Sequence, residues 1–275
     1  MLSEITMLSP RQTFEDNMRP AKLLLQVYRL LDSNDTIQTQ GELVEALRRV
    51  VRASGEEDLM LVYNEIFLGL VRERAQLPRS TLRQTTLCHL LRQAVVASCT
   101  ALETYLPILL RANLPILIRA KGRDFVPRGD QTLQEYFADL RFSLDDTLRL
   151  LEDPNPALYI SEKILGLASF SYLSSRKGVH VVGALLGLTK PWDEIAEHLN
   201  RDKKELMKTM DETVRRRNDI VHRADRSQDD PGGDAQSITF AWTQQAVDTI
   251  NHICLALDEL VVVQIGLMQA MIGEG

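Results

Sequence analysis

The segment RRRNDIVHRAD, residues 215–225, gathers cationic and proton-handling side chains in a chain that is acidic overall. It places Arg217 and His222 five positions apart, with Asn218 directly after the arginine. Histidine titrates near neutral pH, so it can accept or donate a proton during a reaction. The guanidinium of arginine presents a planar fork of donors that suits phosphoryl and carboxylate oxygens. The segment therefore holds the residue types needed to bind an anion and to transfer a proton.

The segment falls near the end of a predicted helix, which turns by about 100° per residue. Leu206, Met210, Val214 and Val221 then form one apolar stripe, and Arg217 falls in the middle of it. A guanidinium on such a face needs a partner, because an unpaired buried charge is very costly. Two interpretations stay open: a structural ion pair with a carboxylate on another helix, or a site kept for an anionic ligand.

His222 falls about 140° around the same helix from Arg217. The two side chains would converge only if the helix ends or distorts near Val221, or if a second copy of the chain faces the first. A histidine at a helix end also interacts favourably with the helix dipole, so a structural role stays open. Arg215 and Arg216 fall on other faces of the helix and are expected to reach solvent.

The hydrophobic periodicity is helical along almost the whole chain. It predicts helices over residues 20–33, 42–54, 56–77, 80–115, 132–153, 161–175, 178–188, 191–200, 202–222 and 239–271. The helix over 80–115 is apolar around most of its surface, which places it at the centre of a bundle, and Pro107 marks where it would break. Residues 178–188 contain Val and Gly that would permit a strand, but the flanking helices favour a helix. The predicted fold class is all-α, a helical bundle.

Two local patterns support particular helices. Asp202 precedes Glu205 by three positions, which is the spacing of a capping box at a helix start. In the last predicted helix, apolar residues alternate at spacings of three and four and predict a packing seam formed by Val247, Ile250, Cys254, Leu257 and Val261.

Composition limits the classes of protein that the chain can belong to. Its 275 residues are 44% apolar and 25% charged, which is typical of one large or two modest globular domains. The net charge of −6 excludes a basic field over the whole surface, so any contact with nucleic acid would have to be local.

Cys88, Cys99 and Cys254 lack the spacing of a disulfide framework or a zinc site, and we expect reduced core thiols. Asp258 and Glu259 interrupt the most apolar stretch, so we expect no membrane segment and a cytoplasmic protein.

The sequence RNDIVH, residues 217–222, resembles the R-x4-H signature of HEPN domains, a superfamily of helical bundles that includes many metal-independent endoribonucleases. The context is similar as well: a polar loop follows the motif-bearing helix, and a long amphipathic helix comes last. Residues 94–110 are similar to the first core helix of the ribosomal-ligand-associated branch. We therefore expect a HEPN-like domain over 79–275. Residues 1–78 would form an additional helical region that docks a regulator.

The resemblance implies a division of roles. His222 would act as general acid or base, Arg217 would bind the phosphate and its transition state, and Asn218 would orient the phosphate or His222. The 2'-OH of RNA would attack the adjacent phosphate, and neither a metal nor another cofactor would be needed. Two protomers facing each other would line one cleft with both motifs. Ala224 stands where related toxins carry a tyrosine that their antitoxin modifies, so that form of control is not expected.

Several other groups are candidates. A local basic patch would track an RNA backbone or simply solvate a helix end: Arg215, Arg216, Arg223 and Arg226. In the resembled family a carboxylate on this helix approaches the motif, so the resemblance implies that Glu103 pairs with Arg217, as a structural partner or to orient it for function. A second basic loop would stack a base on Phe125 or only solvate the surface; its cations are Arg119, Lys121, Arg123 and Arg128. An acidic loop lacks calcium-loop spacing and is expected to be flexible and solvated: Asp225, Asp229, Asp230 and Asp234. The remaining histidines, which have no second ligand at useful spacing, are His89, His180, His198 and His252.

Two functions from different classes remain. The first is a dimeric HEPN-type endoribonuclease that acts on RNA as a toxin or antiphage effector, with an antitoxin or a sensor protein as candidate partner. The second is a catalytically silent HEPN-like binding subunit of a larger complex, in which Arg217 and His222 only stabilise an interface.

Overall fold

A computed structural model describes residues 9–31 and 84–273 of the chain. Within these residues the chain forms nine α-helices and no strand, which confirms the predicted all-α bundle. The helices expected over 42–54 and 56–77 lie outside the described residues.

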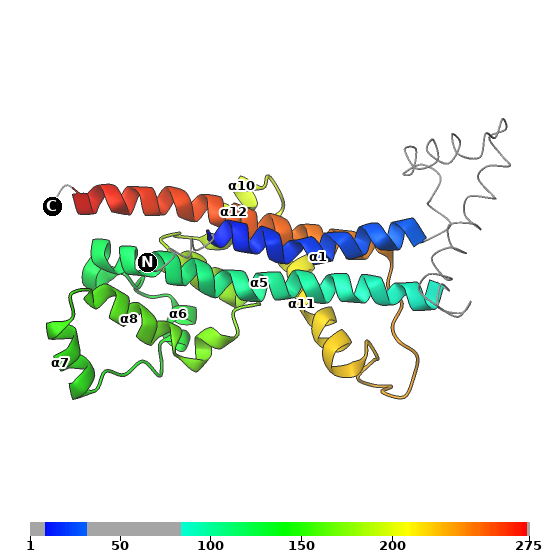
Figure 1. Ribbon diagram of the computed structural model, residues 1–275, viewed down its shortest axis with the longest axis horizontal. Coiled ribbons are helices and arrows are strands. Elements are labelled where there is room, and N and C mark those ends of the chain that lie inside the picture. The colour runs from blue at the N-terminus through cyan, green and yellow to red at the C-terminus, as the bar shows by residue number, and fades with distance from the viewer. Residues whose placement is uncertain (1–8, 32–83, 274–275) are drawn as a thin grey trace, which may run out of the picture.

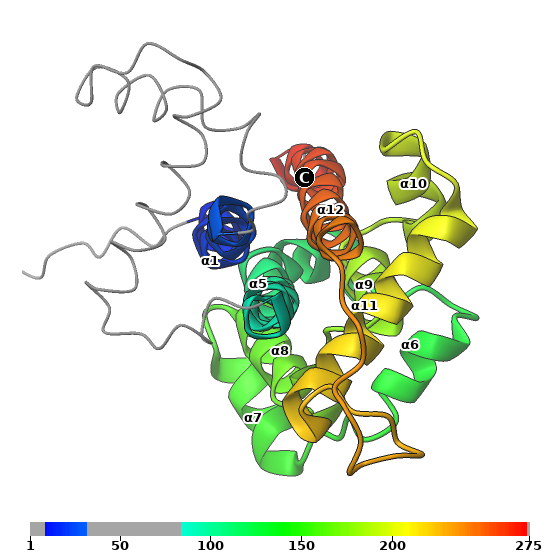
Figure 2. The ribbon, with the colours of Figure 1, turned by 90° about the vertical axis from the view of Figure 1, so that its right-hand side faces the viewer.

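Three long helices lie side by side along the molecule: α1 (Pro10–Leu31), α5 (Gln84–Lys121) and α12 (Phe240–Gly273) (Figure 1). Viewed down the long axis, α1 lies on one side of α5 and most of the shorter helices lie on the other (Figure 2). Phe14 and Met18 of α1 are fully buried in the same apolar core as the side chains of α5 and α12. The first of the N-terminal helices therefore packs as part of the bundle.

The central helix α5 is longer than its sequence pattern predicts. It runs without a break from Gln84 to Lys121, so the break expected near Pro107 does not occur, and Pro115 also lies inside the helix. Its apolar side chains are buried against α1, α8, α11 and α12, and this tertiary packing offsets the hydrogen bonds that the prolines cannot make. By length and composition alone, α5 and α12 could also cross a membrane, although core helices of soluble proteins share these properties.

Shorter segments complete the bundle beside α5. They are η2 (Gly122–Asp124), α6 (Gln131–Tyr136), α7 (Leu144–Glu152), α8 (Pro156–Leu165), η3 (Ala168–Ser171), α9 (Arg176–Leu185) and α10 (Pro191–His198). Helices α8 and α9 pack against α5, and α10 packs against α12. The helix predicted over 178–188 is confirmed by α9, although it begins two residues earlier.

Three predicted helix boundaries are wrong. The helix expected from Pro20 begins at Pro10, because the buried stripe of α1 continues across the second proline. The single helix expected over 132–153 is divided: Ser143 caps α7 and exchanges hydrogen bonds with Asp146 in a capping box. The helix expected over 161–175 begins earlier and ends at Leu165.

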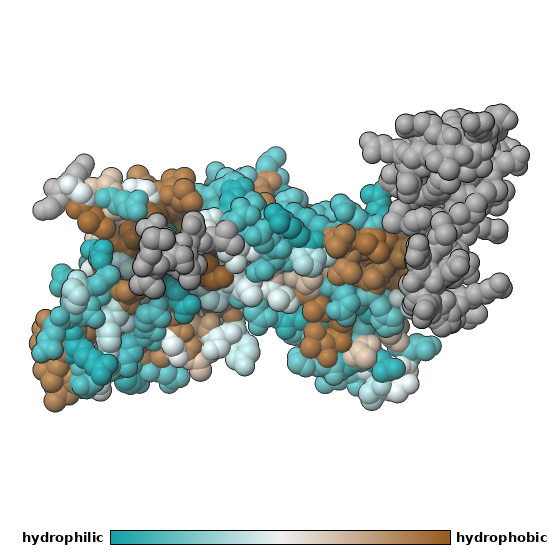
Figure 3. Space-filling model, viewed as in Figure 1, coloured by the Kyte–Doolittle hydropathy of each residue, from teal (hydrophilic) through white to brown (hydrophobic). Residues whose placement is uncertain are grey.

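Exposed apolar side chains gather at one end of the molecule, on α7 and on the last turns of α12 (Figure 3). On α7 they are Leu144, Leu148 and Leu151, and on α12 they are Val262, Val263, Leu267, Met271 and Ile272. The seam predicted in α12 is confirmed, because all five of its residues are buried. The seam holds the first half of α12 in the core and leaves its end outside.

Candidate functional site

The motif lies on α11 (Lys203–Arg223), which packs against α5 and α12. Asp202 caps this helix by accepting a hydrogen bond from the backbone N–H of Glu205 at 2.8 Å, as its spacing predicts. The buried face is formed by Leu206, Thr209, Met210, Thr213 and Ile220. Val221 is 51% exposed, so its predicted place in the apolar stripe is wrong. Arg217 lies on the buried face, as expected, because the true stripe continues through Ile220.

Arg217 is held from three directions. Its Nη2 donates to Oε2 of Glu103 on α5 at 2.8 Å and to Oγ of Ser174, just before α9, at 3.3 Å. Its Nη1 donates to Oδ1 of Asn218 at 3.1 Å. The ion pair expected between Glu103 and Arg217 is therefore present, with the arginine side chain 17% exposed and the carboxylate 38% exposed. These contacts fix the orientation of the guanidinium while leaving other donors unused.

A buried thiol lies beside this ion pair. Burial raises the pKa of Cys99 to about 11, against the opposing effect of the nearby Arg217 guanidinium. The thiol therefore stays protonated at neutral pH and is a poor nucleophile. Cys99 is one helical turn from Glu103 on α5 and is fully buried, as the sequence predicts for a core thiol.

His222 lies in the last turn of α11 and is exposed. Within residues 9–31 and 84–273 it makes no hydrogen bond and no ion pair. The helix continues to Arg223, so the distortion considered near Val221 is not found, and Arg217 and His222 remain about 140° apart. One chain thus directs the guanidinium toward α5 and the imidazole toward solvent.

A buried acidic residue, Asp225, follows the end of the helix that carries the motif. Ala224 and Asp225 adopt left-handed backbone conformations, with φ values of 51° and 63°. The Asp225 carboxylate is fully buried and pairs with Nε of Arg92 and Nε of Arg216, both at 2.6 Å. Each arginine also donates to the carbonyl oxygen of Gln236, at 2.9 and 3.1 Å. We call these three charged residues the Asp225 clamp, since they tie the end of α11 to α5 and to the returning loop.

The Asp225 clamp overturns two expectations. Asp225 does not belong to a flexible, solvated acidic loop, because it is the fully buried acceptor for two arginines. Arg216 does not reach freely into solvent: its side chain is 17% exposed and its guanidinium lies 5.7 Å from the ring centre of Trp242. The sequence gives no signal for these contacts, since Asp225 and Arg92 are far apart in the chain.

The other members of the predicted basic patch remain at the surface. Arg215 is exposed and has no ion pair with any residue in the described part of the chain. Arg223 pairs with Asp219 one turn earlier, and Arg226 donates to a carbonyl of the following loop. Among these cations, Arg215 is thus the one without a partner in the described residues.

The second basic loop is less suited to stacking a base. Phe125 is half-buried, and its ring packs edge-on against Phe137 at 6.5 Å. Arg119 donates to Asn155 at 2.7 Å and Arg128 pairs with Asp124 at 2.9 Å, so both cations have local partners.

The histidines outside the motif have mixed environments. His180 contacts Asp130 at 2.7 Å, and His198 contacts Glu259 at 2.9 Å. The hydrogen bond from His198 and a second one from Arg11 lower the pKa of Glu259. In the part of the chain that the structure covers, no three His, Cys, Asp or Glu side chains cluster as metal ligands would.

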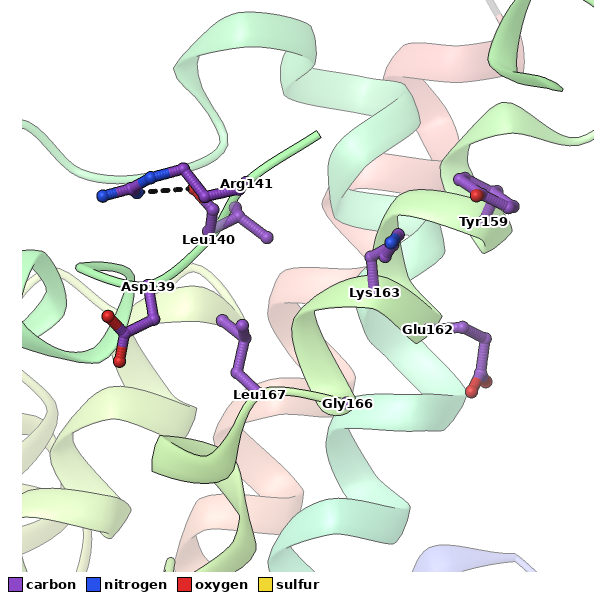
Figure 4. A pocket seen from close by; sticks show the side chains of 8 residues that line it. All are labelled: Asp139, Leu140, Arg141, Tyr159, Glu162, Lys163, Gly166 and Leu167. Atoms are coloured by element: carbon purple, nitrogen blue, oxygen red, sulfur yellow. Dashed lines mark hydrogen bonds between the residues drawn. The ribbon is translucent and has the colours of Figure 1, made fainter. Parts of the chain in front are cut away.

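A separate hollow of about 400 Å³ lies between α8 and the segment before α7 (Figure 4). It is lined by Asp139, Leu140, Arg141, Tyr159, Glu162, Lys163, Gly166 and Leu167. The polar groups of Tyr159 and Lys163 are engaged by Asp146, at 2.6 and 2.9 Å. No residue of the R-x4-H motif lines this hollow.

The motif region therefore combines an oriented guanidinium, an exposed imidazole and the Asp225 clamp. The clamp fixes the end of α11, which carries both groups, to α5 and to the following loop. Because the two groups point to different surfaces of one chain, a single anion could contact both only between two copies of the motif. No protein-family model, no curated protein and no solved structure matches the chain.

Proposed function

We propose that this chain is a metal-independent endoribonuclease of the HEPN type that acts as a homodimer. The observation that carries the proposal is the contrast between two side chains of one helix. Arg217 is held in place by Glu103 and Ser174, whereas His222 is exposed and has no partner among the described residues. An oriented cation and a free imidazole are what phosphodiester cleavage without a metal needs.

The reaction begins with attack of a ribose 2'-oxygen on the adjacent phosphorus. The bond from phosphorus to the 5'-oxygen breaks, which leaves a 2',3'-cyclic phosphate and a free 5'-hydroxyl. One imidazole takes the proton of the 2'-OH, and a second imidazole from the other copy protonates the departing 5'-oxygen. The unused donors of Arg217 stabilise the charge on the phosphoryl oxygens. DNA lacks the 2'-OH and is not cleaved by this route.

The proposal needs a dimer because Arg217 and His222 diverge within one chain. A twofold axis near the end of α11 brings the two copies of the motif to one cleft through an isologous interface. The exposed apolar end of α12 lies at the other end of the molecule and does not serve this purpose. The first turns of α12, which follow the motif loop, are the better candidate for the interface. A cytoplasmic toxin or antiphage effector, held by an antitoxin or sensor, is the corresponding biological role.

The test compares two exposed histidines that lack partners among the described residues, His222 on α11 and His89 on α5. Purified wild type, His222→Ala, Arg217→Ala and His89→Ala are incubated with end-labelled RNA and a chelator. We expect His222→Ala to lower the cleavage rate about 100-fold or more, and His89→Ala to leave it unchanged. Products ending in a 2',3'-cyclic phosphate support the mechanism. Equal cleavage by wild type and His222→Ala, or cleavage of an all-DNA analogue, would refute it.

A second function is favoured by one observation. Glu103 neutralises Arg217, as it would in a catalytically silent subunit whose motif only stabilises an interface. Glu103→Gln separates the two functions. In the enzyme, this variant retains RNA binding but cleaves more slowly, because the guanidinium loses its fixed orientation. In the silent subunit, it changes only stability, by about 1 kcal/mol or less since the carboxylate is more than one third exposed.

A further inference from the structure

A basic groove lies on the exposed side of α11, upstream of the motif. It has a volume of about 310 Å³, and five of its lining side chains are cationic: Arg176, Lys203, Lys204, Lys208 and Arg215. Asp211 is the one carboxylate in its lining. This local excess of positive charge stands out in a chain whose net charge is −6.

The groove is aligned with the motif histidine. At about 100° per residue, Lys204, Lys208, Arg215 and His222 fall within an arc of about 40° on one face of α11. All four side chains are exposed. His222 lies eighteen positions after Lys204, which corresponds to about 27 Å of helix. The exposed imidazole therefore lies on the same face of α11 as the groove cations, about 10 Å of helix beyond Arg215, whereas Arg217 faces away toward α5.

The cations of this row are available to a ligand. Lys204 and Arg215 have no ion pair with any residue that the structure describes. Lys208 of the row has one carboxylate partner, at 3.8 Å. The other two groove cations, Arg176 and Lys203, each have one as well, at 3.5 and 2.7 Å, and all three pairs are solvent-exposed. Exposed pairs of this kind contribute little, so an anionic ligand can replace them.

An aromatic side chain adjoins the row. Arg215 also lines a second hollow, of about 220 Å³, together with Arg216, Gln236, Trp242 and two carboxylates, Glu212 and Asp219. Trp242 is half-buried, and its ring lies beneath the Arg216 guanidinium. An indole beside a chain of cations is the combination with which proteins bind single-stranded nucleic acid, because bases stack on the ring while cations follow the backbone.

We infer that the exposed face of α11 is the track for a single-stranded RNA, with Lys204, Lys208 and Arg215 contacting successive phosphates and leading the strand to His222. This inference rests on the proposed function for the identity of the ligand, but binding does not require cleavage. A linear row of cations fits a polynucleotide backbone better than a lipid surface, because Met207 is the one apolar residue in the groove lining.

The experiment measures binding separately from catalysis. A fluorescent 2'-O-methyl RNA of about 12 nucleotides, which has no free 2'-OH to attack, is titrated with the full chain and followed by anisotropy. We expect the double variant Lys204→Glu/Lys208→Glu to bind at least about tenfold more weakly than wild type. Its plot of log affinity against log salt should be less steep by about 0.7 for each phosphate that the variant no longer binds. The matched control is Arg123→Glu, a charge reversal at a side chain that is 91% exposed on η2.

Two further variants sharpen the result. Asp211→Asn removes the carboxylate of the groove, so it should tighten binding. Binding should also quench the fluorescence of Trp242, and Trp242→Phe should abolish that quenching. Far-UV circular dichroism confirms that each exposed substitution leaves the helices intact.

The outcomes separate this inference from the ribonuclease proposal. If His222→Ala abolishes cleavage but Lys204→Glu/Lys208→Glu binds like wild type, the track is wrong and the ribonuclease stands. If the double variant loses binding while wild type never cleaves, the track stands and the ribonuclease fails. Equal weakening by Arg123→Glu overturns the track. Competition by polyglutamate or by phosphatidylserine vesicles at matched charge also overturns it, in favour of an acidic protein or a membrane.

Discussion

The Asp225 clamp is the feature whose removal should be most visible. Asp225→Ala deletes the carboxylate that pairs with Arg92 and Arg216, both at 2.6 Å. The two guanidiniums then face each other without a counter-charge, with side chains that are 8% and 17% exposed. The substitution also places an alanine at a φ of 63°, a conformation that Asp tolerates better than Ala.

The expected cost follows from these two effects. Removing one partner of a buried ion pair costs about 3–5 kcal/mol of unfolding free energy. The left-handed conformation adds about 1 kcal/mol. Both arginines keep a carbonyl acceptor at Gln236, which moderates the loss. We therefore expect about 4 kcal/mol for Asp225→Ala. Asp225→Asn should lose less, because it keeps one of the two acceptor oxygens and tolerates the backbone conformation.

Urea unfolding followed by far-UV circular dichroism measures the change. The midpoint should fall at an unchanged slope, and the melting temperature should fall by about 8–16 °C, since 1 kcal/mol corresponds to roughly 2–4 °C in a chain of this size. Asp229→Ala, an exposed aspartate of the same loop, is the control and should change stability by no more than about 0.5 kcal/mol. A loss below about 1 kcal/mol for Asp225→Ala would show that the clamp does not hold the end of α11.

Two further predictions concern other parts of the bundle. Burial raises the pKa of Asp258, against the opposing effect of the hydrogen bond from Tyr105. The protonated carboxyl therefore favours the folded state at pH values below its pKa in the unfolded chain. This contribution to stability is lost as the pH rises through the pKa of the folded protein. Asp258→Asn should therefore gain stability over wild type at about pH 7 and differ less at about pH 4, and an equal difference in urea midpoints at both would contradict this. Gly178→Ala should lower the melting temperature because its Cβ would lie 1.9 Å from the carbonyl oxygen of Leu173. The matched change Gly266→Ala meets no atom within 4 Å in α12 and should stabilise by about 0.5–1 kcal/mol; a loss at both glycines would refute the steric argument.

The sequence predicts helices well where one face of the helix is continuously apolar. The seam of α12 and the cap of α11 follow from local patterns that the fold retains. The missed boundaries also had local signals: Ser143 stands three residues before Asp146, and Asn155 precedes Pro156, as in capped helix starts. The hydrophobic periodicity of the flanking residues continues across these boundaries and hides the signals. The start of α1 was missed for another reason, because packing against α5 maintains a helix through Pro20.

In the candidate site, too, some contacts could be predicted from the sequence and others could not. The burial of Arg217 and its need for a carboxylate partner could be predicted, because a cation on an apolar face requires a counter-charge. The choice of Glu103 as that partner rests on the family resemblance rather than on spacing. The inward turn of Arg216 could not, since it depends on Asp225 in a loop that looks solvated in the sequence. Arg92, which completes the Asp225 clamp, carries no motif and lies on another helix. Contacts of this kind arise only when the chain is folded, so local spacing does not reveal them.

Because α11 is a regular helix to its end, the R-x4-H spacing places Arg217 and His222 on different faces of it. Five residues place Arg217 against its own core, where Glu103 and Ser174 can hold it, and place His222 on the outer face with the groove cations. The left-handed turn at Ala224 and the Asp225 clamp stop α11 immediately after the histidine, so the imidazole stands at the end of the cationic row rather than within it. A strand bound along that row would present a phosphate to His222, but the guanidinium that must stabilise it would have to come from another copy. In the proposed ribonuclease, substrate binding and catalysis would thus be properties of different units: the track would belong to one chain, and the complete site would belong to the dimer.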